Sequence, residues 1–240
     1  MNNVIQFLAH KRHVVGGAIP LPASKCIPAW FKDIPHDIPL EDGTVKTSVK
    51  GCMPFIDAMK FGYVIRAGCD MTLRGWVEDG VKHWSANWSI PKYFDPDDLI
   101  VPHDERQLEG EPINNSGAIA LKFNANFTIK TPQGYSCLIT PLLNNPYLLN
   151  KGLHLYSAVV DTDHHPVPTS LPFSLTNLSG EEIAIDKGTP LAQVMPFKRE
   201  DWEMEVKEQS QDELLASVQL FYSKFSATYR KLFRQPKRYK

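Results

Sequence analysis

The sequence predicts a single, mainly β domain of the sandwich type, with an extended proline-rich N-terminal arm and a C-terminal amphipathic helix. Three observations support this prediction. Apolar and polar residues alternate strictly between residues 119 and 130, as in a strand with one buried face. The chain has 19 prolines and 14 glycines, a content that favours short elements joined by ordered loops. Towards the C-terminus the apolar period changes to that of a helix.

The composition is that of a folded protein without a strong charge preference. Of the 240 residues, 42% are hydrophobic and 22% are charged, and the formal net charge is −1. The whole chain therefore has no field that would attract nucleic acid or a membrane, and charge can act only locally. No apolar run approaches the ~20 residues of a membrane span, and residues 1–15 lack the apolar region of a secretion signal. We expect a cytoplasmic protein, or a virion protein if it is phage-encoded.

The four cysteines are predicted to be reduced thiols, because none forms the close pair that presents two thiolates to one zinc ion. They are Cys26, Cys52, Cys69 and Cys137. His164 and His165 beside Asp161 could hold a metal if they lie in a turn. Adjacent strand residues point to opposite faces, however, which favours solvated turn residues. We predict neither a metal site nor a cofactor.

Three regions follow one another: an arm over residues 1–52, a β-domain over 53–200 and a helix with a basic tail over 201–240. The prolines of the arm exclude a long helix or a central strand. Apolar residues such as Trp30 and Phe31 indicate that the arm packs on the body.

Short strands dominate the β-domain. A short helix is predicted first, at 54–61, because Pro54 lies in its first turn, where the missing N–H costs nothing. An acidic, turn-rich loop at 95–117 precedes the clearest strand, 119–129. Shorter strands bounded by Pro, Gly or Asn are predicted at 135–140, 153–160, 171–177, 182–185 and 191–197.

An amphipathic helix is predicted over residues 212–233. Its apolar residues fall at spacings of 4, 3, 4 and 7: Leu214, Val218, Phe221, Phe225 and Leu232. Acidic residues precede the helix and basic residues end it, an order that suits the helix dipole. An isolated helix of this length is marginal in water, so something must cover the apolar stripe. We expect the helix to project its basic end from the body and to make intermolecular contacts.

The contacts expected are with a second copy of the chain or with another protein. The candidate partner-binding residues are Phe221, Phe225, Arg230, Arg234 and Lys237. The basic tail is either a solvated helix end or a weak electrostatic contact with nucleic acid or an acidic partner. No contact with a membrane is expected.

Four segments in order carry motifs: RAGCDM at 66–71, ITPLLNNPY at 139–147, VVDTD at 159–163 and KGTPLAQ at 187–193. This order resembles the β-clip fold of trimeric dUTPases and dCTP deaminases. The resemblance implies that Asp70 is the acid of the first motif and Gln193 the glutamine of the fourth. It places Asp161 where that family keeps the carboxylate that activates the attacking water.

Several residues depart from the family pattern. Residues 142–145 are LLNN, without the Arg and Ser that grip a phosphate, and His164 replaces the tyrosine that stacks below the nucleoside. The Gly-rich last motif is missing. Phosphoryl transfer depends on positioned cations and donors, so the resemblance implies the fold rather than the activity. We assign no catalytic residue, and the candidate ligand-binding residues are Asp70, Asn144, Asp161, Asp163 and Gln193.

A second resemblance covers nearly the whole chain. Its motifs include PLPAS at 20–24, PAWF at 28–31, CMPF at 52–55, FTIKTPQGY at 127–135 and KGTP at 187–190. Together they resemble a family of proteins found in bacteria and tailed phages, to which no activity is assigned.

Three classes of function stay open. The first is a non-enzymatic assembly or binding protein, phage-encoded and part of a particle, which the arm, the helix and the incomplete catalytic set favour. The second is a divergent dUTPase-like protein that binds or hydrolyses a nucleotide. The third is a small-molecule or carbohydrate-binding protein in which tryptophans stack on the ligand, although such residues more often form a core cluster. These tryptophans are Trp76, Trp84 and Trp88.

Overall fold

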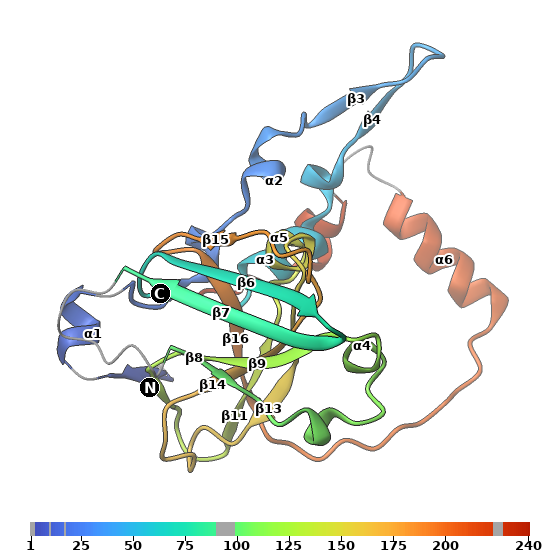
Figure 1. Ribbon diagram of the computed structural model, residues 1–240. Helices are drawn as coiled ribbons and strands as arrows, with labels where there is room; N and C mark the ends of the chain where they lie inside the picture. Colours follow the sequence, from blue (N-terminus) through green and yellow to red (C-terminus); the bar gives the residue numbers. More distant parts are fainter. Residues whose placement is uncertain (1–2, 10, 17, 90–98, 223–227) are drawn as a thin grey trace.

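The protein is represented by a computed structural model that describes residues 3–9, 11–16, 18–89, 99–222 and 228–240. It is mainly β, as the sequence predicts, and its strands pair antiparallel (Figure 1). Three sheets of five, four and three strands enclose one core, and two two-stranded ribbons lie beside them. No helix in the described ranges is long and apolar enough to cross a membrane.

The five-stranded sheet has the order β13-β11-β16-β5-β2. Its strands are β2 (Leu21–Pro22), β5 (Tyr63–Arg66), β11 (Tyr135–Thr140), β13 (Ala158–Val160) and β16 (Pro190–Lys198). The central strand β16 is apolar along most of its length, with Ala192 and Val194 fully buried. A continuous apolar run of this kind is expected for a strand that is covered on both faces.

The four-stranded sheet has the order β12-β14-β9-β8, and the three-stranded sheet the order β15-β6-β7. The former contains β8 (Ile100–Pro102), β9 (Ile119–Asn124), β12 (Leu153–Leu155) and β14 (Ser170–Leu175). The latter contains β6 (Met71–Glu78), β7 (Val81–Trp88) and β15 (Ile183–Ile185). Phe123 of β9 and Phe173 of β14 stack with ring centroids 4.2 Å apart in the centre of the core.

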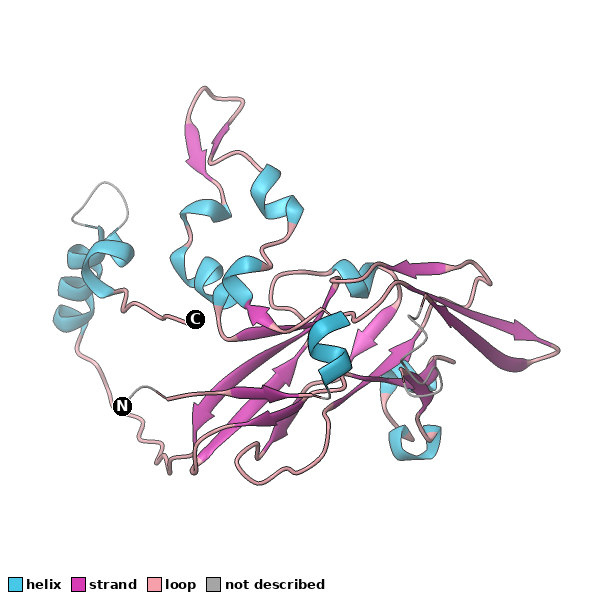
Figure 2. Ribbon diagram, turned by 90° about the vertical axis from the view of Figure 1, so that its left-hand side faces the viewer, coloured by secondary structure: helices cyan, strands magenta, loops and turns pink. Residues whose placement is uncertain are grey.

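The helices are short and lie at the ends of the sheets or outside them (Figure 2). They are α1 (Lys11–Gly16), α2 (Ala29–Asp33), α3 (Met53–Lys60), α4 (Pro112–Asn115), α5 (Tyr147–Asn150) and α6 (Gln211–Tyr222). Single turns occur at η1 (Ala23–Lys25), η2 (Val49–Gly51), η4 (Glu105–Leu108) and the π-turn η5 (Tyr229–Phe233). The expected helix at 54–61 is therefore present as α3, with Pro54 in its first turn.

The strand predicted over 119–129 is present, but it is broken into β9 and β10 (Thr128–Lys130). Its alternating residues are buried as expected, with Leu121, Phe123 and Ile129 at most 2% exposed. The break lies at Asn126, whose φ of 57° takes the backbone out of the β region. Beyond it, β10 pairs with β1 (Gln6–Leu8) instead of β14.

Two further predictions need correction. The strand predicted over 153–160 is two strands, because β12 pairs with β14 in one sheet and β13 pairs with β11 in another. The stretch 95–117 is not simply a loop, since its described part contains β8, η4 and α4. These elements cover one edge of the four-stranded sheet, where β8 pairs with β9.

Two segments project from the body towards the same side (Figures 1 and 2). One carries the ribbon of β3 (Asp37–Pro39) and β4 (Val45–Thr47), all of whose residues are exposed. The other begins after β16 and carries α6. Residues 199–210 between β16 and α6 have no regular secondary structure and are exposed throughout.

Candidate functional site

The predicted acidic residues Asp161 and Asp163 lie in a turn after β13. The backbone N–H groups of His164 and His165 both donate to the carbonyl of Asp161, at 3.0 and 2.9 Å, and close the turn. Ser136 of β11 donates its hydroxyl to Asp161 Oδ1 at 2.7 Å. The Asp161 side chain is 67% exposed, so this carboxylate is accessible to solvent.

Asp163 is buried in the same turn and is held by Arg199. Its side chain is 3% exposed, and both of its oxygens accept hydrogen bonds from the Arg199 guanidinium. The N–H of Gly134 also donates to Oδ2, at 2.9 Å. These hydrogen bonds, above all those from Arg199, hold the pKa of Asp163 well below its usual range. Asp163 is therefore a charged anchor whose oxygens are already occupied.

Arg199 is the residue that the sequence analysis missed. It also donates to Ser136 Oγ at 2.9 Å and to the carbonyl of Tyr135 at 3.0 Å, and it lies 3.4 Å from Asp161 Oδ1. Because a guanidinium presents several donors in a fixed plane, one side chain joins the end of β16 to the turn at 161–163. No motif marks Arg199, since its partners lie far away in the sequence.

Asp70 is not part of this cluster. Its Oδ1 accepts the backbone N–H of Lys187 at 2.7 Å, and its carbonyl accepts that of Ser89 at 2.9 Å. Asp70 thus fastens the turn after β15 to the start of β6. Among the described residues no hydrogen bond joins Asp70 to Asp161.

Gln193 and Asn144 meet at α3 instead. Gln193 is 1% exposed and donates to the carbonyls of Ala58 and Phe61 at 2.9 and 2.5 Å, while it accepts the N–H of Leu143 at 3.1 Å. Asn144, with a φ of 56°, donates to the carbonyl of Phe55 at 3.3 Å. Both side chains brace α3 against the turn at 142–145. Their role in binding a ligand, like that of Asp70, stays a prediction.

The partner-binding candidates are divided between the projecting segment and the body. Phe221 lies on α6 and stacks on Phe233 of η5, with ring centroids 6.1 Å apart. Arg230 is exposed. Phe225 falls outside the described residues.

Arg234 and Lys237 both bind Asp57 of α3. The Arg234 guanidinium donates to Asp57 at 2.8 and 3.0 Å, and the Lys237 ammonium donates at 3.3 Å. These contacts, chiefly the hydrogen bonds from Arg234, lower the pKa of Asp57. The expectation that the basic end projects from the body is therefore wrong. Asp57 is only 8% exposed, and a buried carboxylate requires a cationic partner.

The tryptophans face two different sides of the β6–β7 ribbon. Trp84 and Trp88 pack against the hydrophobic core, as a core cluster would. Trp76 lies on the opposite face, where it stacks on His83 at 5.4 Å and lies under the Arg74 guanidinium at 5.2 Å. The three rings therefore do not form one stacking surface.

The histidines of the turn do not gather with other metal ligands. Within the described ranges no three His, Cys, Asp or Glu side chains are placed to hold one metal ion. The side chain of His164 is 75% exposed and lies 3.6 Å from Asp163.

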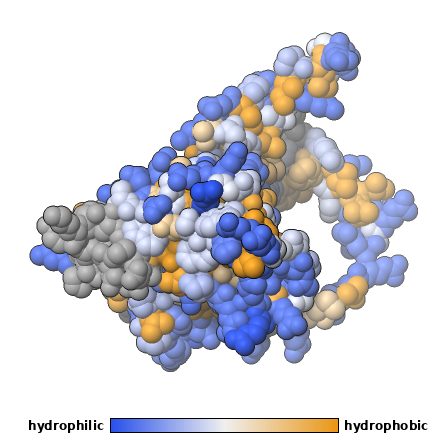
Figure 3. All heavy atoms as spheres, viewed as in Figure 1, coloured by the Kyte–Doolittle hydropathy of each residue, from blue (hydrophilic) through white to orange (hydrophobic). Residues whose placement is uncertain are grey.

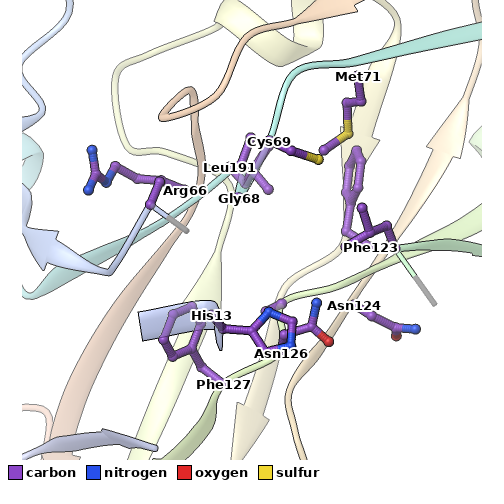
Figure 4. A pocket seen from close by; sticks show the side chains of 14 residues that line it. His13, Arg66, Gly68, Cys69, Met71, Phe123, Asn124, Asn126, Phe127 and Leu191 are labelled. Carbon is purple, nitrogen blue, oxygen red and sulfur yellow. The ribbon is translucent and has the colours of Figure 1, made fainter. Parts of the chain in front are cut away.

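Several cavities open on the surface of the described part of the chain, and one of them has a volume of about 40 Å³. Figure 4 shows its apolar wall, which includes Cys69, Met71 and Phe123, opposite His13 and Asn126. A water molecule needs roughly 10–15 Å³ of such volume, so the cavity has room for only a few water molecules. It is too small for a substrate.

Two further cavities differ in chemistry. The first, which we call the tyrosine cavity, has a volume of about 560 Å³ and is lined by Tyr63, Tyr135 and Tyr239 together with Arg238 and Lys240. The second, which we call the apolar groove, has a volume of about 370 Å³. Its apolar lining residues include Ile113, Pro141, Leu142, Pro146, Leu149 and Leu155.

Comparison with known proteins gives weak similarities to solved structures. No protein-family model and no curated protein matches the sequence. Among solved structures, the chain is similar to a mutant dUTPase from phage phi11 of S. aureus that coordinates a structural Mg(II) ion. The identity is 14% and the TM-score 0.29, over 39% of this chain and 75% of that one. It is also similar to the native dUTPase of EIAV, with 11% identity and a TM-score of 0.30, over 59% of this chain and 98% of that one.

Proposed function

We propose that this chain is a non-enzymatic assembly protein that forms homo-oligomers through the projecting segment 202–221. The observation that carries the proposal is the exposure of large apolar side chains on this segment. Helix α6 has no buried residue, although Leu214, Val218 and Phe221 lie on one stripe. Their exposed fractions are 50%, 42% and 42%. Figure 3 shows hydrophobic atoms at the surface of the projecting segment that carries α6, at the right of the view.

The segment before α6 has a second apolar stripe, with the period of a strand. Trp202, Met204 and Val206 are 86%, 90% and 85% exposed. Glu205 and Lys207 on the alternate positions form an ion pair of 2.8 Å, as expected when residues i and i+2 share a face of an extended chain. Contiguous exposed apolar residues of this kind mark interaction surfaces.

The segment is also fixed in place at both of its ends. Arg199 binds the buried carboxylate of Asp163 before it, and Arg234 binds that of Asp57 after it. Ser210 and Glu213 form a reciprocal capping box, in which each side chain accepts the other's backbone N–H, at 3.3 and 3.2 Å. A helix that is capped, is anchored at both sides and has no buried residue is well suited to bind a partner.

A second copy of the chain is the partner that the surface fits best. The body has an unfilled apolar groove, and Leu149 on its rim is 51% exposed. An amphipathic helix that lies in an apolar groove is a common mode of recognition. The chain therefore carries both halves of such a contact, α6 and the groove.

The test is the mass of the protein in solution, measured by size-exclusion chromatography with light scattering. We expect a multiple of the 27.1 kDa chain mass. The double variant Leu214→Glu, Val218→Glu and the groove variant Leu149→Glu should both shift the mass to that of one chain. The matched control Ser217→Glu, Gln219→Glu adds the same charge to exposed positions off the apolar stripe and should leave the mass unchanged.

A single-chain mass for the intact protein at high concentration would contradict the proposal. So would a control variant that dissociates as much as the α6 and groove variants.

The dUTPase-like alternative is tested in the same samples. Because residues 142–145 provide no cation or hydroxyl, we expect neither dUTP hydrolysis nor dCTP deamination with Mg²⁺. Turnover that is lost in Asp161→Asn would favour the alternative over assembly.

A further inference from the structure

The tyrosine cavity has the size and the concave form of a ligand site. Its volume of about 560 Å³ lies within the range of small-molecule pockets, roughly 300–1,000 Å³. Five parts of the chain that are distant in sequence form its walls: residues 3–5, the first residue of β5, residues 131–135, Pro196 of β16 and the C-terminal residues 238–240. It does not include the turn at 161–163 or any residue of α6.

The C-terminal wall of the cavity is fixed to the body. Tyr239 packs edge-to-face on Phe61 and on Tyr63, with ring centroids 5.2 and 5.8 Å apart. The hydroxyl of Tyr63 lies 3.4 Å from the carbonyl of Lys240. Together with the pairing of Arg234 and Lys237 to Asp57, these contacts turn the tail into a wall of the cavity.

The phenols of the cavity are able to donate hydrogen bonds at neutral pH. Burial raises the pKa of Tyr63 and that of Tyr239 above the usual value, so both hydroxyls keep their protons. Asn3 donates its amide to the Tyr135 hydroxyl at 2.7 Å, which leaves the proton of Tyr135 available for another acceptor. The cavity thus combines aromatic rings with O–H donors.

Two cations complete the lining. Arg238 and Lys240 are exposed, and no acidic side chain in the described ranges forms an ion pair with either. Asp57 is already bound by Arg234 and Lys237, so it is not available to pair with the two cations at the cavity. No Asp or Glu is among the residues that line the cavity.

We propose that the tyrosine cavity binds a small anion that carries a flat ring, of the class of aromatic phosphate monoesters. A dianion can accept hydrogen bonds from the Arg238 guanidinium, the Lys240 ammonium and the Tyr135 hydroxyl together, and such charge-assisted bonds are strong. The ring of the ligand packs on the tyrosine rings in offset or edge-to-face geometry. This site is independent of the assembly surface.

The test uses calorimetric titration of the intact protein with phenylphosphonate, whose P–C bond resists hydrolysis. We expect saturable binding with a dissociation constant of about 1 mM or tighter. Inorganic phosphate and benzyl alcohol, each of which provides only half of the ligand, should bind at least about tenfold more weakly. Titration with 5′-AMP is compared with that of phenylphosphonate. Tighter binding of 5′-AMP would indicate a nucleoside phosphate as the ligand, and tighter binding of phenylphosphonate a simple aryl phosphate.

Variants locate the site. Arg238→Gln with Lys240→Gln should weaken the binding of phenylphosphonate about tenfold or more. The matched control, Arg230→Gln with Lys231→Gln, removes the same charge from η5 and should leave the affinity unchanged. Tyr135→Phe keeps the ring and loses the donor, so it provides a second test that does not disturb the tail. Equal affinities in the cavity variants and the control, or no binding of phenylphosphonate, would overturn the proposal.

Discussion

At the scale of single residues, two buried carboxylates determine where the C-terminal part of the chain is attached. Asp163 binds Arg199 at the start of the projecting segment, and Asp57 binds Arg234 at its end. The side chains of these carboxylates are 3% and 9% exposed, so each requires its partner to remain charged. Asp163, Arg234 and the positive tail can be recognised in the sequence, but their pairing cannot. Nothing in a sequence shows which distant carboxylate is buried.

The pairing of Asp57 predicts a pH-dependent contribution to stability. Arg234 lowers the pKa of Asp57 in the folded protein, so the stabilisation is fully present above the ordinary carboxyl pKa of about 4. This stabilisation is lost as the pH falls through the lowered pKa that Asp57 has in the folded protein. At pH 7, Arg234→Gln should therefore lower the Tm by about 3–6 °C, and the difference from the natural chain should shrink below about pH 4.

Differential scanning calorimetry across this pH range makes the measurement. Arg230→Gln is the matched control, because Arg230 is exposed and pairs with no acid in the described part of the chain. Its Tm should follow that of the natural chain at every pH. A Tm difference for Arg234→Gln that does not shrink at all as the pH falls from 7 to 2 would show that the pair acts through packing alone.

At the scale of elements, the apolar pattern predicted most strands but not the sheets to which they belong. The expected strand 135–140 coincides with β11, and 171–177 and 191–197 lie within two residues of β14 and β16. The segments 119–129 and 153–160 were each predicted as one strand, but each of them forms two strands in the structure. The alternation of apolar residues continues through the break at Asn126, because the chain stays in contact with one core while it changes partners from β14 to β1.

The candidate site was less predictable than the fold for a related reason. His164 and His165 lie in a turn, as expected, but distant residues hold this turn, because Ser136 binds Asp161 and Arg199 binds Asp163. The contacts of Gln193 with α3 and of Asp70 with Lys187 join residues more than a hundred positions apart. The resemblance of the motifs grouped Gln193 and Asp70 as candidate ligand-binding residues. It could not show that their side chains instead make structural hydrogen bonds within this chain.

The strand β9 provides the test of the alternating pattern. Phe123 is 2% exposed and stacks on Phe173, so Phe123→Asp buries an unpaired carboxylate and should unfold the domain, at a cost of several kcal/mol. Asn124 on the other face accepts the Ser170 hydroxyl at 3.1 Å, and Asn124→Asp keeps an acceptor there. It should change the free energy of unfolding by no more than about 0.5 kcal/mol. Urea unfolding measures the free energy of unfolding of both variants. Equal losses of stability would mean that the two faces of β9 do not differ in burial.

At the scale of the whole molecule, the body presents α6 on a segment that leaves from β16 and returns at α3 (Figure 1). A contact between α6 and the groove joins two different patches of the surface. Two copies can therefore exchange helices reciprocally in a twofold dimer, or several copies can bind head to tail in a ring. In either arrangement the tail stays attached to its own body through Asp57, so assembly does not disturb the tyrosine cavity.

Deletion of residues 211–240 separates assembly from folding. The truncated chain should remain a folded β-domain, because the described part of α6 contributes no residue to the core. It should also have a lower mass in light scattering than the intact protein. Its Tm should fall by about 3–6 °C, since Asp57 loses both cations and the rings of Phe61 and Tyr63 lose their contact with Tyr239.

A second change to the truncated chain distinguishes the two causes of that loss. Asp57→Asn removes the charge that has lost its partners, and an unpaired amide costs less to bury than an unpaired carboxylate. In the truncated chain this substitution should therefore raise the Tm, whereas in the intact protein it breaks the pair with Arg234 and should lower it. Opposite signs of the Tm change in the truncated and the intact chain would show that the tail binds the body through Asp57. If the truncated chain instead becomes insoluble while the intact protein is a single chain in solution, α6 is part of the core and the assembly proposal fails.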